Sequence, residues 1–168
     1  MNIERWHPSV TVAAIVADAA GRYLLVEEQT SQGLRLNNPA GHLDPGETLV
    51  QACRRETLEE TAHGFTPTAL VGVYLAGPGA VPSADASPRA RITYLRFAFC
   101  GELGDREPDR ALDAGIVRTV WMDIDEIRAS RARHRSPVLL HCIEDYIAGA
   151  RYPLDLLSSD LGPGLRSA

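Results

Sequence analysis

The chain has 168 residues, of which 45% are hydrophobic and 23% are charged, and its formal net charge is −5 at pH 7. This length and composition predict a single soluble globular domain. The negative charge argues against a nucleic acid polymer as partner, whereas a small phosphorylated ligand is compatible with it if a metal ion neutralises the phosphate. The three cysteines, Cys53, Cys100 and Cys142, are far apart, so neither a disulfide framework nor a structural zinc site is expected.

No apolar run of the sequence reaches 18 residues, so no membrane-spanning helix is predicted. Residues 10–17 are apolar, but their β-branched character and the single Arg5 before them favour a strand over a secretory signal. We therefore expect a cytoplasmic protein that does not bind membranes and is a monomer or a small homo-oligomer.

The first predicted elements are buried strands at residues 9–18 and 22–29, joined by a link short enough for a β-hairpin. Glu27 and Glu28 close the second strand. We expect both side chains to be solvated, with the alternative that one of them faces a metal site. Residues 30–38 are predicted to form a polar loop.

A helix is predicted after the turn-rich segment 41–46. Thr48 is a suitable N-cap, and Gly64 is the expected left-handed residue that ends the helix. Pro67 soon after it would prevent the helix from resuming. We expect His42 to be an ordinary polar loop residue, with a contact to ligand or phosphate as the alternative.

Three carboxylates dominate this predicted helix. Glu56, Glu59 and Glu60 stand at positions i, i+3 and i+4, so they share one helical face. Like charges at this spacing destabilise a helix, and a divalent cation with oxygen ligands would offset their repulsion. Mg²⁺ suits such a site best, with Mn²⁺ as a possible substitute, because it binds through one or two carboxylates and reaches substrate phosphates.

The remaining elements follow from periodicity and capping signals. Three strands are predicted at 65–76, 91–103 and 116–122, and two helices at 123–130 and 138–150, with Asp123 and Ser136 as N-caps. In the strand at 91–103, Tyr94 and Arg96 are predicted to face one side and Leu95, Phe97 and Phe99 the other. Loops at 77–90 and 104–115 separate these elements. The arginines that follow, Arg128, Arg131, Arg133 and Arg135, are expected to be solvated.

The helix and the turn before it resemble the Nudix box, G-x5-E-x7-R-E-U-x-E-E-x-G-U, in which U is aliphatic. The matching positions are Gly41, Glu47, Arg55, Glu56, Glu59 and Glu60. Three positions depart from the pattern: Thr57 and His63 replace aliphatic residues, and Ala62 replaces glycine. None of these changes removes a carboxylate, so we interpret them as adjustments of the helix and its end.

The resemblance implies an α/β protein with the Nudix fold, in which a mixed β-sheet is sandwiched between α-helices. We expect one Nudix hydrolase domain over residues 1–153 and a mobile C-terminal tail over 154–168. A Ser/Gly/Pro-rich composition after Tyr152 supports the tail.

The resemblance also implies roles for individual residues. Glu56 and Glu60 would hold the metal, with help from Glu59 and the backbone carbonyl of Gly41. Glu47 and Arg55 would form a clamp that orients a metal-binding glutamate. Glu59 would accept a proton from the attacking water, although a loop acid such as Asp113 is an equally open candidate.

Shorter stretches over most of the chain, such as VTVAAIVAD, NNPAGHLDPGETLVQA and RYPLDLL, resemble NudJ-type phosphatases of the Nudix superfamily. This similarity implies Mg²⁺-dependent hydrolysis of nucleoside tri- and diphosphates and of thiamin-type pyrophosphates, with release of orthophosphate. Two alternatives stay open. One is a pyrophosphohydrolase of dinucleoside polyphosphates or nucleotide sugars, and the other is a non-enzymatic sensor of a phosphorylated metabolite.

Overall fold

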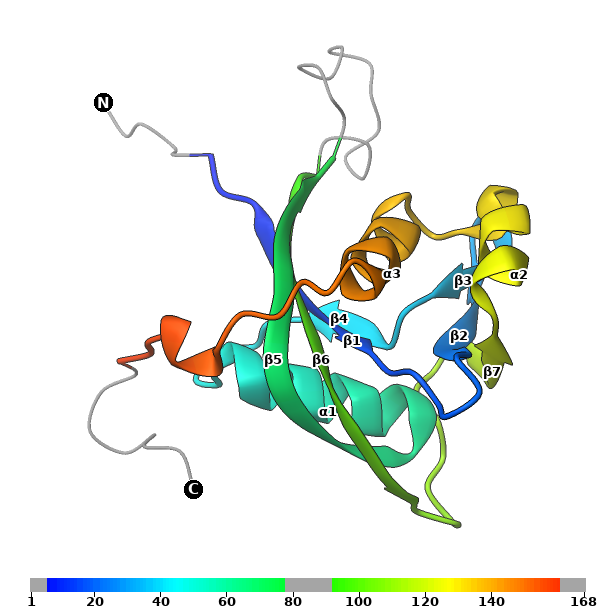
Figure 1. Ribbon diagram of the computed structural model, residues 1–168, viewed down its shortest axis with the longest axis horizontal. Coiled ribbons are helices and arrows are strands. Elements are labelled where there is room, and N and C mark those ends of the chain that lie inside the picture. The colour runs from blue at the N-terminus through cyan, green and yellow to red at the C-terminus, as the bar shows by residue number, and fades with distance from the viewer. Residues whose placement is uncertain (1–5, 78–91, 161–168) are drawn as a thin grey trace.

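The computed structural model describes residues 6–77 and 92–160. Seven strands and three α-helices are present in this part of the chain, together with two short 3-10 helices (Figure 1). The strands are β1 (Ser9–Ile15), β2 (Tyr23–Thr30), β3 (Gly33–Asn37), β4 (Ala40–His42), β5 (His63–Ala76), β6 (Tyr94–Arg106) and β7 (Ile116–Met122). The helices are α1 (Leu49–Thr61), α2 (Ile124–Ala129), α3 (Val138–Ile147), η2 (Arg131–Arg133) and η3 (Leu154–Leu156).

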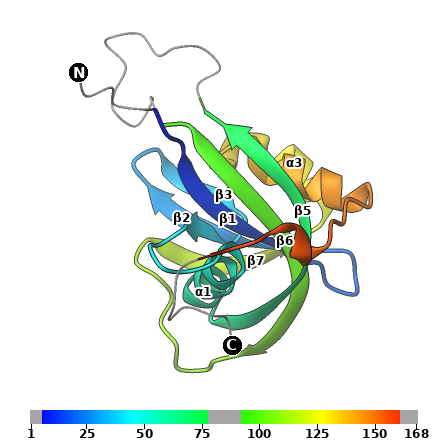
Figure 2. The same ribbon diagram turned by 90° about the vertical axis from the view of Figure 1, so that its left-hand side faces the viewer.

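The strands form two sheets. The larger has the order β4-β1-β6-β5, and it is mixed because β1 runs parallel to β6 and antiparallel to β4. The smaller is antiparallel, with the order β3-β2-β7. Helices α1 and α3 lie on opposite faces of the larger sheet (Figures 1 and 2). The expected mixed sheet between helices is therefore confirmed.

The side chains of β6 point alternately to the two faces of the larger sheet and contribute to a separate hydrophobic core on each face. Phe97 and Phe99 pack into the core beneath α1, and Ala98 and Cys100 pack into the core beneath α3. Successive side chains of a strand point to opposite faces, so the predicted two-sided strand is confirmed. The other two cysteines, like Cys100, are buried and free.

Helix α1 begins as the sequence predicts and ends earlier. The Thr48 side chain accepts a hydrogen bond from the Gln51 backbone, and the Gln51 side chain completes the capping box. The expected end at Gly64 is wrong, because Ala62 already adopts the left-handed conformation with φ 59° and donates its N–H to Leu58. Gly64 belongs to β5, which starts at His63 immediately after the cap.

Two predictions around β2 are corrected by the topology. Asp18 caps a tight turn before β2, but β1 and β2 then enter different sheets, so no extended hairpin forms. Residues 30–38, predicted as a loop, contain β3, which pairs antiparallel with β2 after a turn in which the Thr30 hydroxyl donates to the Gly33 carbonyl. Pairing with a neighbouring strand outweighs the polar composition of this segment.

The last helices follow the predicted positions with changes at their ends. Asp123 caps α2 through a capping box with Glu126, as predicted. Ser136 is not the N-cap of α3, because that position is Pro137, and the helix ends at Ile147 instead of Ala150. Within the segment predicted as a mobile tail, Leu154 and Leu157 pack against the α1-side core, and residues 161–168 lie outside the described chain. Among the helices described, none combines the length and the apolar character that a bilayer span needs.

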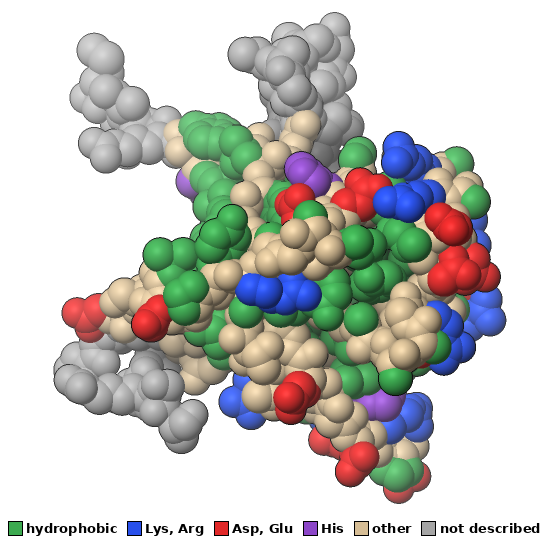
Figure 3. Space-filling model, viewed as in Figure 1, with side chains coloured by type: hydrophobic (Ala, Val, Ile, Leu, Met, Phe, Trp, Pro, Cys, Tyr) green, Lys and Arg blue, Asp and Glu red, His purple; other side chains and the backbone are tan. Residues whose placement is uncertain are grey.

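Charged side chains gather over the smaller sheet and α2, at the right-hand end of the face in Figure 3, while hydrophobic side chains occupy its middle. The structure corrects the expectation that Glu27 is solvated: it is 3% exposed. Arg118 donates to Glu27 Oε2 over 2.6 Å, and Arg133 pairs with the other carboxylate oxygen. Arg133 therefore is not a free solvated cation either. This cluster ties β2, β7 and η2 together.

We expect Glu27→Gln to lower the free energy of unfolding by about 1–3 kcal/mol at neutral pH, because the amide offers no charge to the two guanidinium groups. Hydrogen bonding from Arg118 holds the pKa of Glu27 below its usual 4.5. The stabilisation is therefore present above about pH 4.5 and is lost as the pH falls through the lower pKa of the folded state.

Urea unfolding at pH 7 and at about pH 3 tests this expectation, and the difference between wild type and variant should shrink in acid. Glu144→Gln is the matched control, since it removes only an exposed partner of Arg128. Its effect should stay below about 1 kcal/mol. Equal effects of the two substitutions at neutral pH would contradict the role given to Glu27.

Candidate active site

Gly41 on β4 leaves room for the carboxylate of Glu56 from α1, and a side chain at this position would compete for that space. A Cβ at this position would lie 2.0 Å from Cδ of Glu56 and 2.1 and 2.2 Å from its two carboxylate oxygens. The carboxylate of Glu56 thus occupies the space beside the strand. Glycine is required here by close approach rather than by backbone conformation.

Arg55 holds four acidic or carbonyl groups in fixed positions. Its Nε and Nη2 donate to the two carboxylate oxygens of Glu47 over 3.0 and 2.7 Å. Nη1 donates to Glu56 over 2.7 Å and to Glu59 over 3.1 Å, and Nη2 also donates to the His42 carbonyl over 2.9 Å. The hydrogen bonds that Arg55 donates to Glu47 raise the pKa of Arg55 further above its already high value. The predicted clamp is present in the structure, and it joins the turn, β4 and α1.

Glu60 lies beside this clamp, and no cationic side chain among residues 6–77 and 92–160 forms an ion pair with it. One of its oxygens accepts a hydrogen bond from the Ala40 backbone N–H over 2.8 Å. Burial raises the pKa of Glu60 to about 8, and the carboxylates of Glu56, Glu28 and Asp113 add to that shift, while the Ala40 bond opposes it. Burial also raises the pKa of Glu56, which Arg55 partly counteracts. Both carboxylates are therefore costly to ionise in the absence of a cation.

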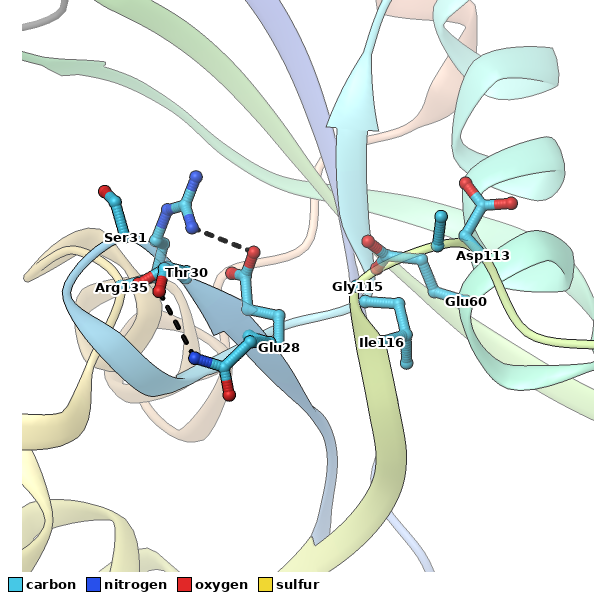
Figure 4. Close-up of a pocket in the computed structure, with 10 residues that line it drawn as sticks. Glu28, Thr30, Ser31, Glu60, Asp113, Gly115, Ile116 and Arg135 are labelled. Atoms are coloured by element: carbon cyan, nitrogen blue, oxygen red, sulfur yellow. Dashed lines mark hydrogen bonds and ion pairs between the residues drawn. The ribbon is translucent and has the colours of Figure 1, made fainter.

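A cavity of about 280 Å³ opens between Glu60 and β2. In Figure 4, Glu60 and Asp113 lie on one side of it, and Glu28 and Arg135 lie on the other. Arg135 donates to Glu28 over 3.0 Å, and the second oxygen of Glu28 is buried without a partner. This size is near the lower end for ligand pockets, so the cavity has room for part of a nucleotide-sized ligand.

The structure brings the predicted residues of α1 together with two acids from elsewhere. Glu47, Arg55, Glu56 and Glu59 form one hydrogen-bonded group with the His42 carbonyl, whereas Glu60 faces the cavity with Asp113. The expectation that Glu28 is solvated is wrong, because one of its oxygens is buried at the cavity and the other pairs with Arg135. The same expectation for Arg135 is wrong, because Arg135 is the partner of Glu28.

His42 and Thr57 illustrate smaller differences from the expectations. His42 is the last residue of β4 rather than a loop residue, and its ring lies 6.2 Å from that of Tyr94. Thr57 is fully buried, and its hydroxyl donates to the Cys53 carbonyl one helical turn earlier over 2.7 Å. The methyl group of Thr57 therefore fills the aliphatic position of the motif while its polar atom is satisfied within α1.

The chemistry of these groups fits a divalent cation. In the described part of the chain, no three His, Cys, Asp or Glu side chains are gathered as a ready-made metal site. Two carboxylates nevertheless lack a full set of partners among the described residues: Glu60 has a raised pKa, mainly because it is buried, and Glu28 has a buried oxygen without a hydrogen-bond partner. Hard oxygen donors of this kind are the ligands that Mg²⁺ and Ca²⁺ prefer.

A clamped, carboxylate-rich helix beside a mixed sheet is the arrangement expected of a Nudix hydrolase. The family model for the NUDIX domain matches residues 7–142, and the chain belongs to this family. It is 35% identical over 151 residues to Phosphatase NudJ of Escherichia coli K12 and of Shigella flexneri, covering 89% of this chain and 90% of each relative.

Solved structures agree with this assignment. A NUDIX hydrolase from Nitrosomonas europaea superimposes with a TM-score of 0.83 at 50% identity, covering 93% of this chain and 99% of that one. A UDP-X diphosphatase shares only the fold, with a TM-score of 0.64 at 17% identity over 89% of this chain and 67% of that one. The protein is therefore a hydrolase that is similar to NudJ phosphatases.

We expect Gly41→Ala to reduce the initial rate of GTP hydrolysis with Mg²⁺ by about 100-fold or more. The new Cβ must displace the Glu56 carboxylate from its place beside Arg55, and a misplacement of about 1 Å costs a reaction on this order. Stability should change little, because the displaced group is the end of a flexible side chain.

Gly64→Ala is the matched control, since no atom lies within 4 Å of the Cβ it would add. Initial rates and thermal unfolding of both variants separate a local effect from a global one. A Gly41→Ala protein that keeps half of the wild-type rate would show that the close approach to Glu56 has no functional role.

Proposed function

We propose that this protein is a Mg²⁺-dependent hydrolase of phosphoanhydride bonds. Its substrates would be nucleoside tri- and diphosphates and thiamin-type pyrophosphates, and its product would be orthophosphate. The observation that carries the proposal is the cavity between Glu60, Glu28 and Asp113, in which excess negative charge accompanies a Glu60 pKa raised to about 8. Such a site is best satisfied by a divalent cation together with an anionic substrate.

Glu56 and Glu60 would be the principal ligands of the cation, with Glu59 and the Gly41 carbonyl as further donors. Glu28 joins this set as an additional donor, because its unpartnered oxygen is buried at the same cavity. When bound, the cation would neutralise phosphoryl oxygens and lower the pKa of water in the site.

Side chains of the protein orient the ligand carboxylates and accept the proton of the attacking water. Glu47 fixes the guanidinium of Arg55, which in turn directs the carboxylates of Glu56 and Glu59 over 2.7 and 3.1 Å. Such support from neighbouring groups decides how well ligand carboxylates perform. Proton acceptance from water is assigned to a carboxylate oxygen of Glu59 or of Asp113, whose backbone N–H donates to the Glu59 carbonyl over 3.0 Å.

The choice of substrate rests on similarity rather than on a specificity pocket. The relatives named Phosphatase NudJ align over nearly the whole chain, which supports release of orthophosphate. Pyrophosphohydrolysis of dinucleoside polyphosphates or nucleotide sugars is the enzymatic alternative. A sensor without activity is less well supported, because every carboxylate of the motif is retained.

We expect the affinity for Mg²⁺ to rise with pH up to about pH 8 and then to level off. Below that value Glu60 carries a proton that the cation must displace, because burial and neighbouring carboxylates raise its pKa. Isothermal titration calorimetry in buffers of different ionisation enthalpy measures both the affinity and the protons released.

Glu60→Gln should remove this pH dependence and should lower the rate of GTP hydrolysis by several orders of magnitude. Glu144→Gln, which changes a glutamate of α3 that pairs with Arg128, should alter neither the pH dependence of Mg²⁺ affinity nor the rate of GTP hydrolysis. If wild-type Mg²⁺ affinity does not vary between about pH 6 and pH 9, Glu60 is not a ligand.

The bond that is cleaved can be identified from the first products of GTP. The proposal predicts GDP and orthophosphate at early times, because cation and water would act on the outermost phosphorus. Phosphorus NMR distinguishes these from GMP and pyrophosphate. Early GMP and pyrophosphate without GDP would favour the pyrophosphohydrolase alternative and leave the family assignment intact.

A further inference from the structure

A row of polar side chains crosses the larger sheet on the face that packs against α3. Strand register aligns one residue from each of the four strands: His42 on β4, Thr11 on β1, Arg96 on β6 and Tyr74 on β5. The row starts at His42, directly after Gly41. Since neighbouring strands are about 4.8 Å apart, Arg96 lies about 10 Å from the β4 edge.

The two outer members of the row have partners. Tyr74 donates its hydroxyl proton to Asp145 over 2.8 Å. The ring of His42 lies against Tyr94, as described above. The two inner members do not: Arg96 Nη1 and Thr11 Oγ1 are buried, and neither has a hydrogen-bond partner.

Arg96 lacks the paired carboxylate that several other arginines of the described chain have. Arg55, Arg118, Arg133 and Arg135 each pair with a glutamate. Within residues 6–77 and 92–160, the buried Nη1 of Arg96 has no hydrogen-bond partner, although the residue as a whole is only half-buried. Burying an unpaired charge is costly, so such a group indicates a counter-ion that comes from outside the chain.

The surroundings of Arg96 specify where that counter-ion lies. Burial lowers the pKa of Arg96, whereas Cys142, Glu60 and Glu28 raise it, so the last two carboxylates are close without contacting it. Arg96 does not line the cavity between Glu60 and Glu28. It therefore lies near the proposed metal site but outside the cavity itself.

We propose that Arg96, assisted by the hydroxyl of Thr11, binds the inner phosphate of a di- or triphosphate substrate while the outer phosphate occupies the carboxylate cavity. The inference rests on the proposed function. A guanidinium presents donors in a planar fork that matches two phosphate oxygens, and Thr11 adds one further donor. The site then selects phosphoanhydrides over phosphate monoesters, since a monoester has no second phosphate for Arg96.

The competing interpretation is that Arg96 only supports the fold. The two interpretations predict opposite effects on stability. Removal of an unpaired buried charge should leave the ligand-free protein as stable as wild type or more stable, because nothing in the described chain depends on that charge. Removal of a structural arginine should instead lower the melting temperature.

The test uses the full chain with Mg²⁺ and imidodiphosphate, a diphosphate in which the bridging oxygen is replaced so that it resists hydrolysis. Calorimetry should give an affinity about 10- to 100-fold lower for Arg96→Met than for wild type. Affinity for orthophosphate should change little. Arg96→Lys should lose less than Arg96→Met, and Thr11→Val should weaken diphosphate binding several-fold. Arg128→Met is the control, because Arg128 pairs with Glu144 at the surface. This substitution should change the affinity for neither imidodiphosphate nor orthophosphate.

Kinetics give an independent readout, since loss of this contact should raise KM for GTP by about the same factor as the loss of imidodiphosphate affinity. Unchanged diphosphate affinity in folded Arg96→Met, or a lower melting temperature with unchanged affinity, would overturn the inference. A wild-type protein that binds imidodiphosphate but hydrolyses no phosphoanhydride would refute the proposed function, and the comparison of variants would still decide the role of Arg96.

Discussion

The contact between Gly41 and Glu56 is the constraint on which the rest of the site depends. Because Gly41 has no side chain, β4 and α1 approach closely enough for the Glu56 carboxylate to fill the space beside the strand. That approach also places the His42 carbonyl within reach of Arg55, and the Ala40 N–H within reach of Glu60. A wider separation would remove both of these backbone contacts between β4 and α1.

Charge balance explains why the site is organised by arginines at its edges. Arg55 neutralises the half of the carboxylate group that lies toward the turn, and Arg135 pairs with Glu28 across the cavity. In the described part of the chain Glu60 lies between them without an ion-pair partner, and Arg96 lies nearby, also without one. A divalent cation and a phosphate chain supply the two missing charges together, so the free protein is arranged for a ligand that brings both.

The sequence predicted most reliably those features that depend on local chemistry. The capping box at Thr48 needs only residues three apart, and the alternation of β6 needs only residues two apart. Failures occurred where a distant partner decided the outcome. Residues 33–37 became a strand because β2 offers an edge for pairing, and Glu27 became buried because Arg118 and Arg133 neutralise it. The residue composition and spacing of those short segments do not indicate the partner.

The sequence by itself determined the family and the carboxylate face of α1, because the spacing of Glu56, Glu59 and Glu60 on a helix fixes their direction. Only the tertiary structure decided which further groups join them. Glu28 and Asp113 meet Glu60 at the cavity, and Arg96 meets Thr11 in a row across the larger sheet. These residues come from separate strands and loops, and strand register and sheet order bring them together. The spacing of residues along the sequence does not reveal that register or that order.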